Sequence, residues 1–218
     1  MGDPIDRNLG FDLVRVTEAA ALSAARWQGR GDKNAADRAA VEALRYVLQS
    51  VRMDGVVVIG EGEKDRAPML YIGERIGTGD PPEVDVAVDP IDGTTPTSKG
   101  LPNAISVVAL ASRGSMFYAP GIVYMEKIAV GPEARGRVHL DEPVASNVKA
   151  VARAKDLELE DVTVVVLDRP RHEGLIREIR DSGARIKLIS DGDVAGAIES
   201  AMEGTGVDIL MGIGGAAE

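Results

Sequence analysis

Two carboxylates and a hydroxyl lie close together in the segment Asp89-Pro90-Ile91-Asp92-Gly93-Thr94. The preceding residues 84–88 alternate like a strand, so we expect the strand to end at Asp89 and the chain to turn there. Pro90 has no backbone N–H, and Asp92-Gly93 is a strong turn signal. Carboxylates fixed on such a turn can bind a hard divalent cation. The segment therefore predicts a site that handles phosphate through metal, with an ordinary Asp-Gly turn as the alternative.

Other acidic residues occur where α/β proteins commonly build their sites. Glu61 and Glu63 follow a short buried strand, and Asp37 lies in the first turn of an expected helix, near Lys33. Open α/β sheets form their sites at the carboxyl ends of strands. Solvated loop acids are the ordinary alternative for the two glutamates, and helix-dipole complementarity is the alternative for Asp37. Their joint occurrence with the segment 89–94 favours one acidic site.

Composition limits the partners of the chain. Its 218 residues carry a formal net charge of -10, which argues against nucleic acid or an anionic membrane as a partner. The absence of cysteine excludes disulfides, thiolate metal sites and cysteine nucleophiles. The first residues are polar and acidic, unlike a signal peptide, and the apolar runs are too short to span a bilayer. We expect a soluble, cytoplasmic protein.

The apolar spacing predicts an α/β protein in two parts. Residues 1–140 are expected to form an α+β domain that carries the acidic metal-binding site, and residues 141–218 a doubly wound β-α-β domain. The expected helices cover 11–27, 34–50, 146–155, 172–180 and 194–202. The expected strands cover 56–59, 84–88, 105–111, 162–167, 186–189 and 207–210, with a further β segment after Gly114 that breaks at 119–121 and ends at 130.

The strand at 207–210 leads into the glycine-rich run 212–215, and the sequence ends at Glu218. A buried parallel strand normally needs a helix on each face, and a glycine-rich exit usually opens one. We therefore expect the second domain to be incomplete at its C-terminus.

The motifs resemble those of a known family. Asp-Pro-Ile-Asp-Gly-Thr downstream of Gly-Glu-Gly-Glu resembles the lithium-sensitive, metal-dependent phosphomonoesterases, which include inositol monophosphatases and fructose bisphosphatases. Further segments are similar to class II fructose-1,6-bisphosphatases and occur in family order at 26–37, 58–63, 67–74, 124–127, 169–172, 191–195 and 212–215. The resemblance implies a layered sandwich like that of the sugar phosphatases and inositol monophosphatases. Family members continue well beyond Glu218, so it also implies that this chain lacks their last part.

The resemblance implies a centre with two or more Mg²⁺ or Mn²⁺ ions. Asp37 and Glu61 would bind one ion, and Asp89, Asp92 and Glu218 would bind another. Oxygen ligands suit these ions, which can activate a water and steady a leaving alkoxide. The family commonly has Glu where Asp92 stands, and a proline where Ala217 precedes Glu218.

The resemblance also implies catalytic and substrate-binding residues. Lys33 would offset phosphate charge, and Thr94, hydrogen-bonded to Asp37 or Asp65, would orient the attacking water. The residues implied to contact the sugar bisphosphate are Asp92, Gly93, Thr94, Tyr124, Arg169, Pro170, Arg171, Asp191, Gly192, Asp193 and Gly215.

Each substrate residue has an ordinary alternative. Arg169 and Arg171 could form a solvated basic loop, residues 191–193 could cap a helix, and Tyr124 could be a core residue. His139 and His172 are too few and too scattered to form a site, so neither is assigned a catalytic role.

The resemblance implies hydrolysis of fructose 1,6-bisphosphate to fructose 6-phosphate and phosphate, as in gluconeogenesis, by direct attack of metal-activated water. Sedoheptulose 1,7-bisphosphate is a second candidate substrate. The alternatives are another phosphomonoesterase, such as an inositol-phosphate phosphatase, an inactive fragment, or a protein that binds metal or sugar phosphate without catalysis. A full-length chain is expected to form homo-oligomers.

Overall fold

A computed structural model of the chain describes residues 8–62, 69–117 and 121–218. The chain divides into two compact units, Met1–Tyr118 and Ala119–Ala216, with Ala217 assigned to the first unit and Glu218 to the second. This division lies before the boundary expected at residue 140, because strand β5 (Tyr124–Val130) pairs with strand β8 (Ile209–Gly215) of the second unit. Each unit is described separately below.

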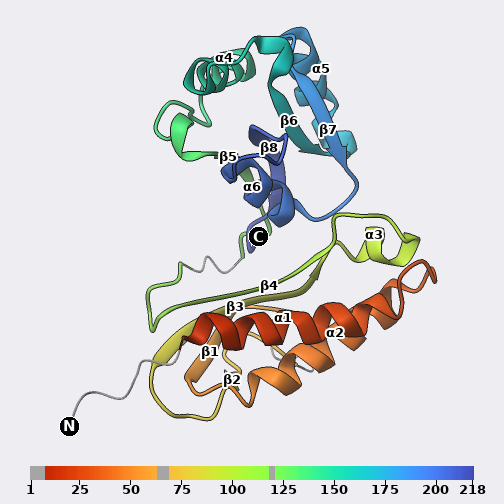
Figure 1. Ribbon diagram of the computed structural model, residues 1–218, viewed down its shortest axis with the longest axis vertical. Coiled ribbons are helices and arrows are strands. Elements are labelled where there is room, and N and C mark those ends of the chain that lie inside the picture. Colours follow the sequence, from red (N-terminus) through yellow and green to blue (C-terminus); the bar gives the residue numbers. More distant parts are fainter. Residues whose placement is uncertain (1–7, 63–68, 118–120) are drawn as a thin grey trace. The chain divides into compact units, whose positions relative to one another are not determined.

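The first unit is a four-stranded mixed sheet with two long helices, α1 (Leu9–Ala25) and α2 (Lys33–Leu48). Its strand order is β2-β1-β3-β4, with bounds Arg75–Ile76 for β2, Asp54–Ile59 for β1, Glu83–Asp92 for β3 and Ile105–Ser112 for β4. Strands β1 and β3 are parallel, while β2 and β4 run antiparallel to their neighbours. Figure 1 shows both helices running alongside this sheet.

Period-two alternation in β3 separates the core face of this sheet from its opposite face. Val84, Val86 and Val88 are buried in one cluster with residues of α1 and α2, as expected for side chains that point to the same side of a strand. The helices contribute small residues such as Ala20 and Ala40 to that cluster. Asn8 and Asp32 cap them, since each side chain accepts a backbone N–H of the first turn.

The structure corrects the predicted turn at Asp89. Strand β3 continues through Asp92, and its register against β4 shifts between Asp89 and Asp92. Asp89 lies opposite Val107 and Asp92 opposite Ile105, so β3 has one more residue than β4 over this interval. The extra residue is a β-bulge at Pro90-Ile91, where a missing N–H is tolerated. Gly93, at φ 104°, then begins a short helix α3 (Thr94–Lys99) that the sequence did not predict.

The second unit is built on a four-stranded sheet of order β5-β8-β6-β7. Strands β6 (Thr163–Leu167), β7 (Arg185–Ile189) and β8 are parallel, and β5 is an antiparallel edge strand. Helices α4 (Val144–Lys155) and α5 (Glu173–Asp181) pack on one face through Val148, Val151 and Ile179. Helix α6 (Asp193–Ala201) packs on the other, against Val165 and Leu210. The predicted doubly wound arrangement is confirmed, with β5 added at its edge.

Two further strand predictions are wrong, one in each unit. Strand β8 does not end at Leu210 but continues to Gly215, because the glycine-rich run pairs with β5 from Tyr124↔Gly215 to Lys127↔Gly212. Residues 115–117, expected in a strand, are not in one. Three short 3₁₀ helices, at Pro132–Ala134, Leu159–Asp161 and Pro170–His172, complete the described elements.

The predicted α/β class is confirmed, because each unit combines a mixed sheet with packed helices. This is consistent with the phosphatase-type sandwich that the motifs implied. Across the described ranges, no helix has the length and apolar character needed to cross a membrane.

Candidate active site

The bulge in β3 places Asp89 and Asp92 on the same face of the first sheet. Residues three apart in a regular strand point to opposite faces. Here both pair with residues two apart on β4, Val107 and Ile105, so both point away from the face that packs on α1 and α2. The backbone N–H of Ile91 donates to Asp89 Oδ1 at 3.0 Å, which fixes that carboxylate at the bulge.

Glu61 lies just beyond β1, whose carboxyl end is at the same sheet edge as that of its parallel neighbour β3. Burial of the carboxyl group, followed by repulsion from Asp37 and Asp89, raises the pKa of Glu61 from 4.5 to about 7. Burial also raises the pKa of Asp37. The repulsion on Glu61 places this carboxylate within electrostatic reach of both Asp37 and Asp89. Three predicted metal ligands, Asp37, Glu61 and Asp89, therefore lie in this unit. Asp92 points to the same side of the sheet as Asp89.

Lys33 is held beside helix α3 by the loop that precedes α2. The N–H groups of Gly29 and Gly31 donate to the carbonyls of Thr97 and Ser98, at 3.0 and 2.8 Å. Lys33 Nζ then donates to Thr95 Oγ1 at 2.6 Å. Lys33 thus contacts Thr95, the second residue of α3. The first residue of α3 is Thr94, whose hydroxyl was predicted to orient the attacking water. The role of Thr95 was missed, because α3 itself was not predicted.

In the second unit, the two predicted arginines have different partners. Arg169 Nη2 donates to Asp191 Oδ1 at 3.1 Å, and its Nη1 donates to the carbonyl of Ser190 at 2.5 Å. Two residues predicted to bind substrate are thus paired with each other. Arg171 instead donates to the carbonyl of Ile213 in β8, from Nε at 3.1 Å and Nη2 at 2.7 Å. Its guanidinium lies 5.2 Å from the centre of the Tyr124 ring, within cation–π range.

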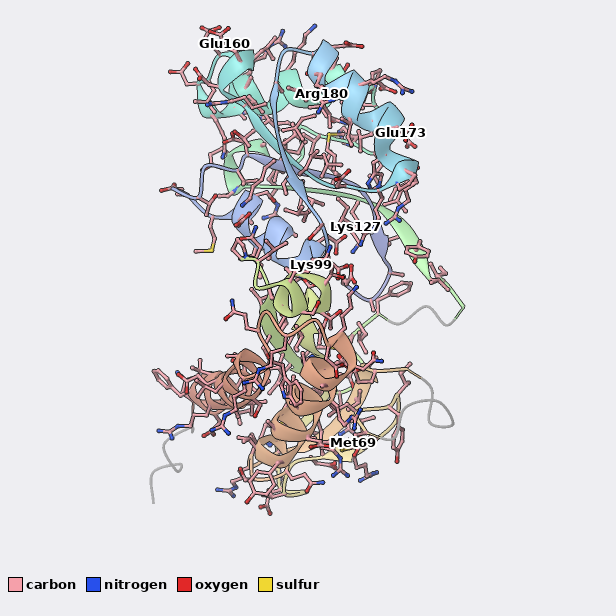
Figure 2. The ribbon with its side chains drawn as sticks, turned by 90° about the vertical axis from the view of Figure 1, so that its right-hand side faces the viewer. Met69, Lys99, Lys127, Glu160, Glu173 and Arg180 are labelled. Carbon is pink, nitrogen blue, oxygen red and sulfur yellow. The ribbon has the colours of Figure 1, made fainter. Side chains whose placement is uncertain are left out.

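Lys127 on β5, which is labelled in Figure 2, contacts two residues that the motifs did not connect with it. Its Nζ lies 2.9 Å from Asp193 Oδ2 and 3.5 Å from Glu218 Oε2. Glu218 Oε2 also accepts the N–H of Gly215 at 3.2 Å. The quoted motif 124–127 contained Lys127, but nothing in the spacing indicated that it meets Asp193 across the sheet.

Asp193 is nearly fully buried, and its second oxygen, Oδ1, has no hydrogen-bond partner among the described residues. Gly214 makes its position possible, since a Cβ at 214 would collide with Asp193 Oδ2. The N-cap residue of α6 is Gly192, which has no side chain to make a capping bond. A buried carboxylate oxygen without a donor can accept a ligand hydroxyl.

Each unit has a hollow in its surface, but of these two only the one in the second unit is lined by a predicted site residue, Arg171. One of about 210 Å³ in the second unit is lined by Lys127, Arg171, Gly212 and Ile213. Another, of about 240 Å³, lies in the first unit beside Pro90 and Ile91, and its other lining residues are neutral, so it is not part of the acidic cluster.

Some predicted site residues are not tested by this geometry. Asp65 and Glu63 lie outside the described residues. Glu218 belongs to the second unit, so its predicted sharing of an ion with Asp89 and Asp92 stays a prediction. Within the described ranges, no three His, Asp or Glu side chains already stand in the geometry of a metal site.

Comparison with known proteins places the chain in a family. The family model described as bacterial fructose-1,6-bisphosphatase, glpX-encoded, matches residues 7–218. The chain belongs to this family. It is 47% identical to the D-fructose 1,6-bisphosphatase class 2/sedoheptulose 1,7-bisphosphatase of Synechococcus sp. (strain JA-2-3B'a(2-13)) over 98% of its own length and 65% of the relative. It is 50% identical to fructose-1,6-bisphosphatase 1 class 2 of Escherichia coli (strain K12), over 97% of this chain and 63% of that one.

The predicted family is thereby confirmed. The chain spans about two thirds of the length of these bacterial fructose-1,6-bisphosphatases.

Proposed function

We propose that this chain hydrolyses fructose 1,6-bisphosphate to fructose 6-phosphate and phosphate, using Mg²⁺ or Mn²⁺. The proposal rests on one observation above all: Glu61 stands in electrostatic reach of Asp37 and Asp89 in a member of the fructose-1,6-bisphosphatase family. Like charges gathered in this way are unfavourable unless a cation or protons neutralise them.

The residues present fit a hard divalent cation. The cluster offers carboxylate oxygens, the donors that Mg²⁺ and Mn²⁺ prefer, and the chain has no cysteine to recruit a softer metal. Asp37, Glu61 and Asp89 would hold the ion, with Asp92 available on the face of Asp89. A bound ion would supply an activated water and polarise the phosphoryl oxygens.

Residues near the cluster would act on the phosphate and the water. Lys33, placed by its bond to Thr95, would offset the charge of the reacting phosphate. Thr94, at the start of α3, would orient the attacking water through its hydroxyl. In the second unit, Arg171 beside Tyr124 would bind a phosphate group, and Asp193 Oδ1 would accept a sugar hydroxyl.

Sedoheptulose 1,7-bisphosphate is a second candidate substrate, because the name of the Synechococcus relative includes that activity. Both compounds are ketose bisphosphates, so the same arginine and aspartate could bind either. Homo-oligomer formation and a cytoplasmic location stay predictions.

The test is phosphate release by the purified chain from fructose 1,6-bisphosphate, sedoheptulose 1,7-bisphosphate and inositol monophosphate, with Mg²⁺ or Mn²⁺. We expect the two bisphosphates to be hydrolysed faster than the inositol ester. Asp89→Asn should lower kcat/KM by at least about a hundredfold, since a metal contributes several kcal/mol of transition-state stabilisation. Glu83→Gln removes an exposed charge from the same strand and should leave the rate unchanged.

Faster turnover of inositol monophosphate would favour another phosphomonoesterase. A folded chain that binds Mn²⁺ but releases no phosphate from any of the three esters would contradict the proposal and favour the inactive fragment. Equal activity of Asp89→Asn and the unchanged chain would contradict the assigned metal site.

A further inference from the structure

His172 is a buried imidazole that connects two strands of the second sheet. Only 1% of its surface is exposed. Its Nδ1 lies 2.7 Å from the carbonyl oxygen of Leu167, the last residue of β6, and its Nε2 lies 2.8 Å from the backbone nitrogen of Ile213 in β8. The spacing of residues did not indicate a role for this histidine, since one of its two backbone partners, Ile213, lies 41 residues away along the chain.

The two partners define the protonation of the ring. A carbonyl oxygen can only accept, so Nδ1 carries the hydrogen, while a backbone N–H can only donate, so Nε2 must be an unprotonated acceptor. The neutral Nδ1–H tautomer satisfies both bonds at once. In the Nε2–H tautomer and in the imidazolium, Nε2–H would face the N–H of Ile213, donor against donor. In the Nε2–H tautomer, Nδ1 would also face the carbonyl of Leu167, acceptor against acceptor.

The imidazole supplies the hydrogen-bond acceptor that a neighbouring strand would otherwise provide to the backbone of β8. Strand β6 pairs with β8 only at Val164↔Ile209 and Val165↔Leu210, so β8 extends beyond its parallel neighbour. The N–H of Ile213 lies in this extension and bonds to His172 instead. Gly212, at φ 147°, allows the close approach, because a Cβ there would lie 3.1 Å from the ring. Buried backbone groups left without a partner are costly, so the ring fixes the path of β8 here.

The carbonyl of the same residue, Ile213, is the acceptor for Arg171. The guanidinium uses its Nε–H and one Nη2–H on that oxygen, at 3.1 and 2.7 Å. Among the described residues, no partner is seen for the other three of its five N–H groups, which include both on Nη1. These three groups can bind a ligand. A guanidinium held along one edge presents its other N–H groups in a fixed direction, which suits a phosphate.

We propose that His172 is a positioning residue that orients Arg171 for phosphate binding through the backbone of Ile213. The chain of contacts is His172 Nε2 to Ile213 N–H, and Ile213 C=O to Arg171. His172 does not touch the phosphate itself. The inference rests on the proposed function only for the identity of the phosphate ligand; the positioning of Arg171 is independent of it.

Two substitutions separate the two bonds of the ring. In His172→Asn the amide nitrogen can replace Nδ1 as a donor to Leu167, but nothing replaces Nε2. In His172→Gln the amide oxygen can take the place of Nε2 and accept from Ile213. His139→Asn is the matched control, because His139 belongs to the same unit but has an exposed side chain that makes neither of these bonds.

The first measurement is hydrogen exchange of the Arg171 Nε–H, followed by NMR in the purified chain. We expect slow exchange in the unchanged protein, His172→Gln and His139→Asn, and clearly faster exchange in His172→Asn. Nitrogen-15 shifts of the His172 ring should report the Nδ1–H tautomer. Unchanged exchange in a folded His172→Asn variant, or an Nε2–H tautomer in the unchanged protein, would overturn the proposal.

The second measurement is steady-state hydrolysis of fructose 1,6-bisphosphate. His172→Asn should raise KM about tenfold with kcat within about twofold, because it weakens binding of a non-reacting phosphate. That increase should vanish in an Arg171→Ala background, as expected when one residue acts through another. An undiminished effect without Arg171 would overturn the proposal. If the unchanged chain hydrolyses no bisphosphate, the proposed function fails, and the exchange measurement still decides the role of His172.

Discussion

At the scale of single residues, two acids on the same face of β3 differ in their surroundings. Asp85 and Asp89 lie opposite Ala111 and Val107, so both point away from α1 and α2. Asp85 is nearly fully buried and faces the turn that follows β4, where Met116 N–H donates to its Oδ2 at 3.1 Å. Asp89 accepts the backbone N–H of Ile91, and its charge repels that of Glu61. Asp85 is therefore structural, whereas Asp89 is the acid that the proposal assigns to the cation.

The stability that Asp85 contributes to the fold should depend on pH. The N–H groups of Gly114, Met116 and Ser115, with help from Arg113, hold its pKa below the ordinary value of 3.8. A lowered folded-state pKa stabilises the fold fully above pH 3.8, and this contribution is lost as the pH falls through the folded-state pKa. Asp85→Asn should therefore lower the Tm at pH 7, and the difference should shrink below pH 3.8. Glu83→Gln, on the same strand, should show no such difference; a deficit for Asp85→Asn that persists well below pH 3.8 would contradict the assignment.

At the scale of elements, the junction of β3 and α3 determines where the site acids point. Gly93 ends the bulged strand, begins the helix and has a φ of 104°. An added Cβ would lie 3.0 Å from Pro96 Cγ and 3.2 Å from Ala104 Cα. The residue therefore needs both the left-handed conformation and the missing side chain.

Gly93→Ala tests this junction against a matched glycine of the same unit. Gly73 has a similar φ of 89°, but an added Cβ there would meet no atom within 4 Å. We expect Gly73→Ala to cost about 1 kcal/mol of unfolding free energy from backbone strain alone, and Gly93→Ala to cost roughly 2–4 kcal/mol, because packing adds to strain. Urea unfolding measures both. Equal losses would mean that packing at the junction contributes nothing.

The long helices and most strands could be predicted because apolar periodicity determines them locally. The end of β3 could not, because Pro90 and Asp92-Gly93 indicate a turn when they are read without the partner strand β4. The extension of β8 was missed for the same reason, since its glycines are in a strand only through pairing with β5. Both errors occur where a strand is defined by its neighbour.

The site was predictable to a similar extent. Acids such as Asp37, Glu61 and Asp89 could be selected by residue type and by motif. Lys127 and His172 could not be assigned roles, because their partners, Asp193 and Ile213, are brought to them only by the sheet. Spacing along the chain predicts which residues bear the chemistry, and tertiary pairing decides which residues orient them.

At the scale of the whole molecule, charge makes the acidic cluster costly without a cation. The chain has a formal net charge of -10, so the repulsion within the cluster adds to repulsion across the rest of the molecule. Removing any acid relieves part of that general repulsion. A test of metal binding must therefore compare acids that change the net charge equally.

Mn²⁺ should stabilise the folded chain through the cluster of Asp37, Glu61 and Asp89. At a free concentration of about one hundred times Kd, a ligand that binds only the folded state raises the unfolding free energy by about 2.7 kcal/mol. Glu42, exposed on α2, is the matched acid, and Glu42→Gln should keep this increase. Glu61→Gln should lose most of it, and without metal it should be at least as stable as the unchanged chain, because the substitution removes repulsion from Asp37 and Asp89. Thermal unfolding with and without Mn²⁺ measures all three chains, and an equal Mn²⁺ effect in Glu61→Gln and Glu42→Gln would show that the ion binds elsewhere.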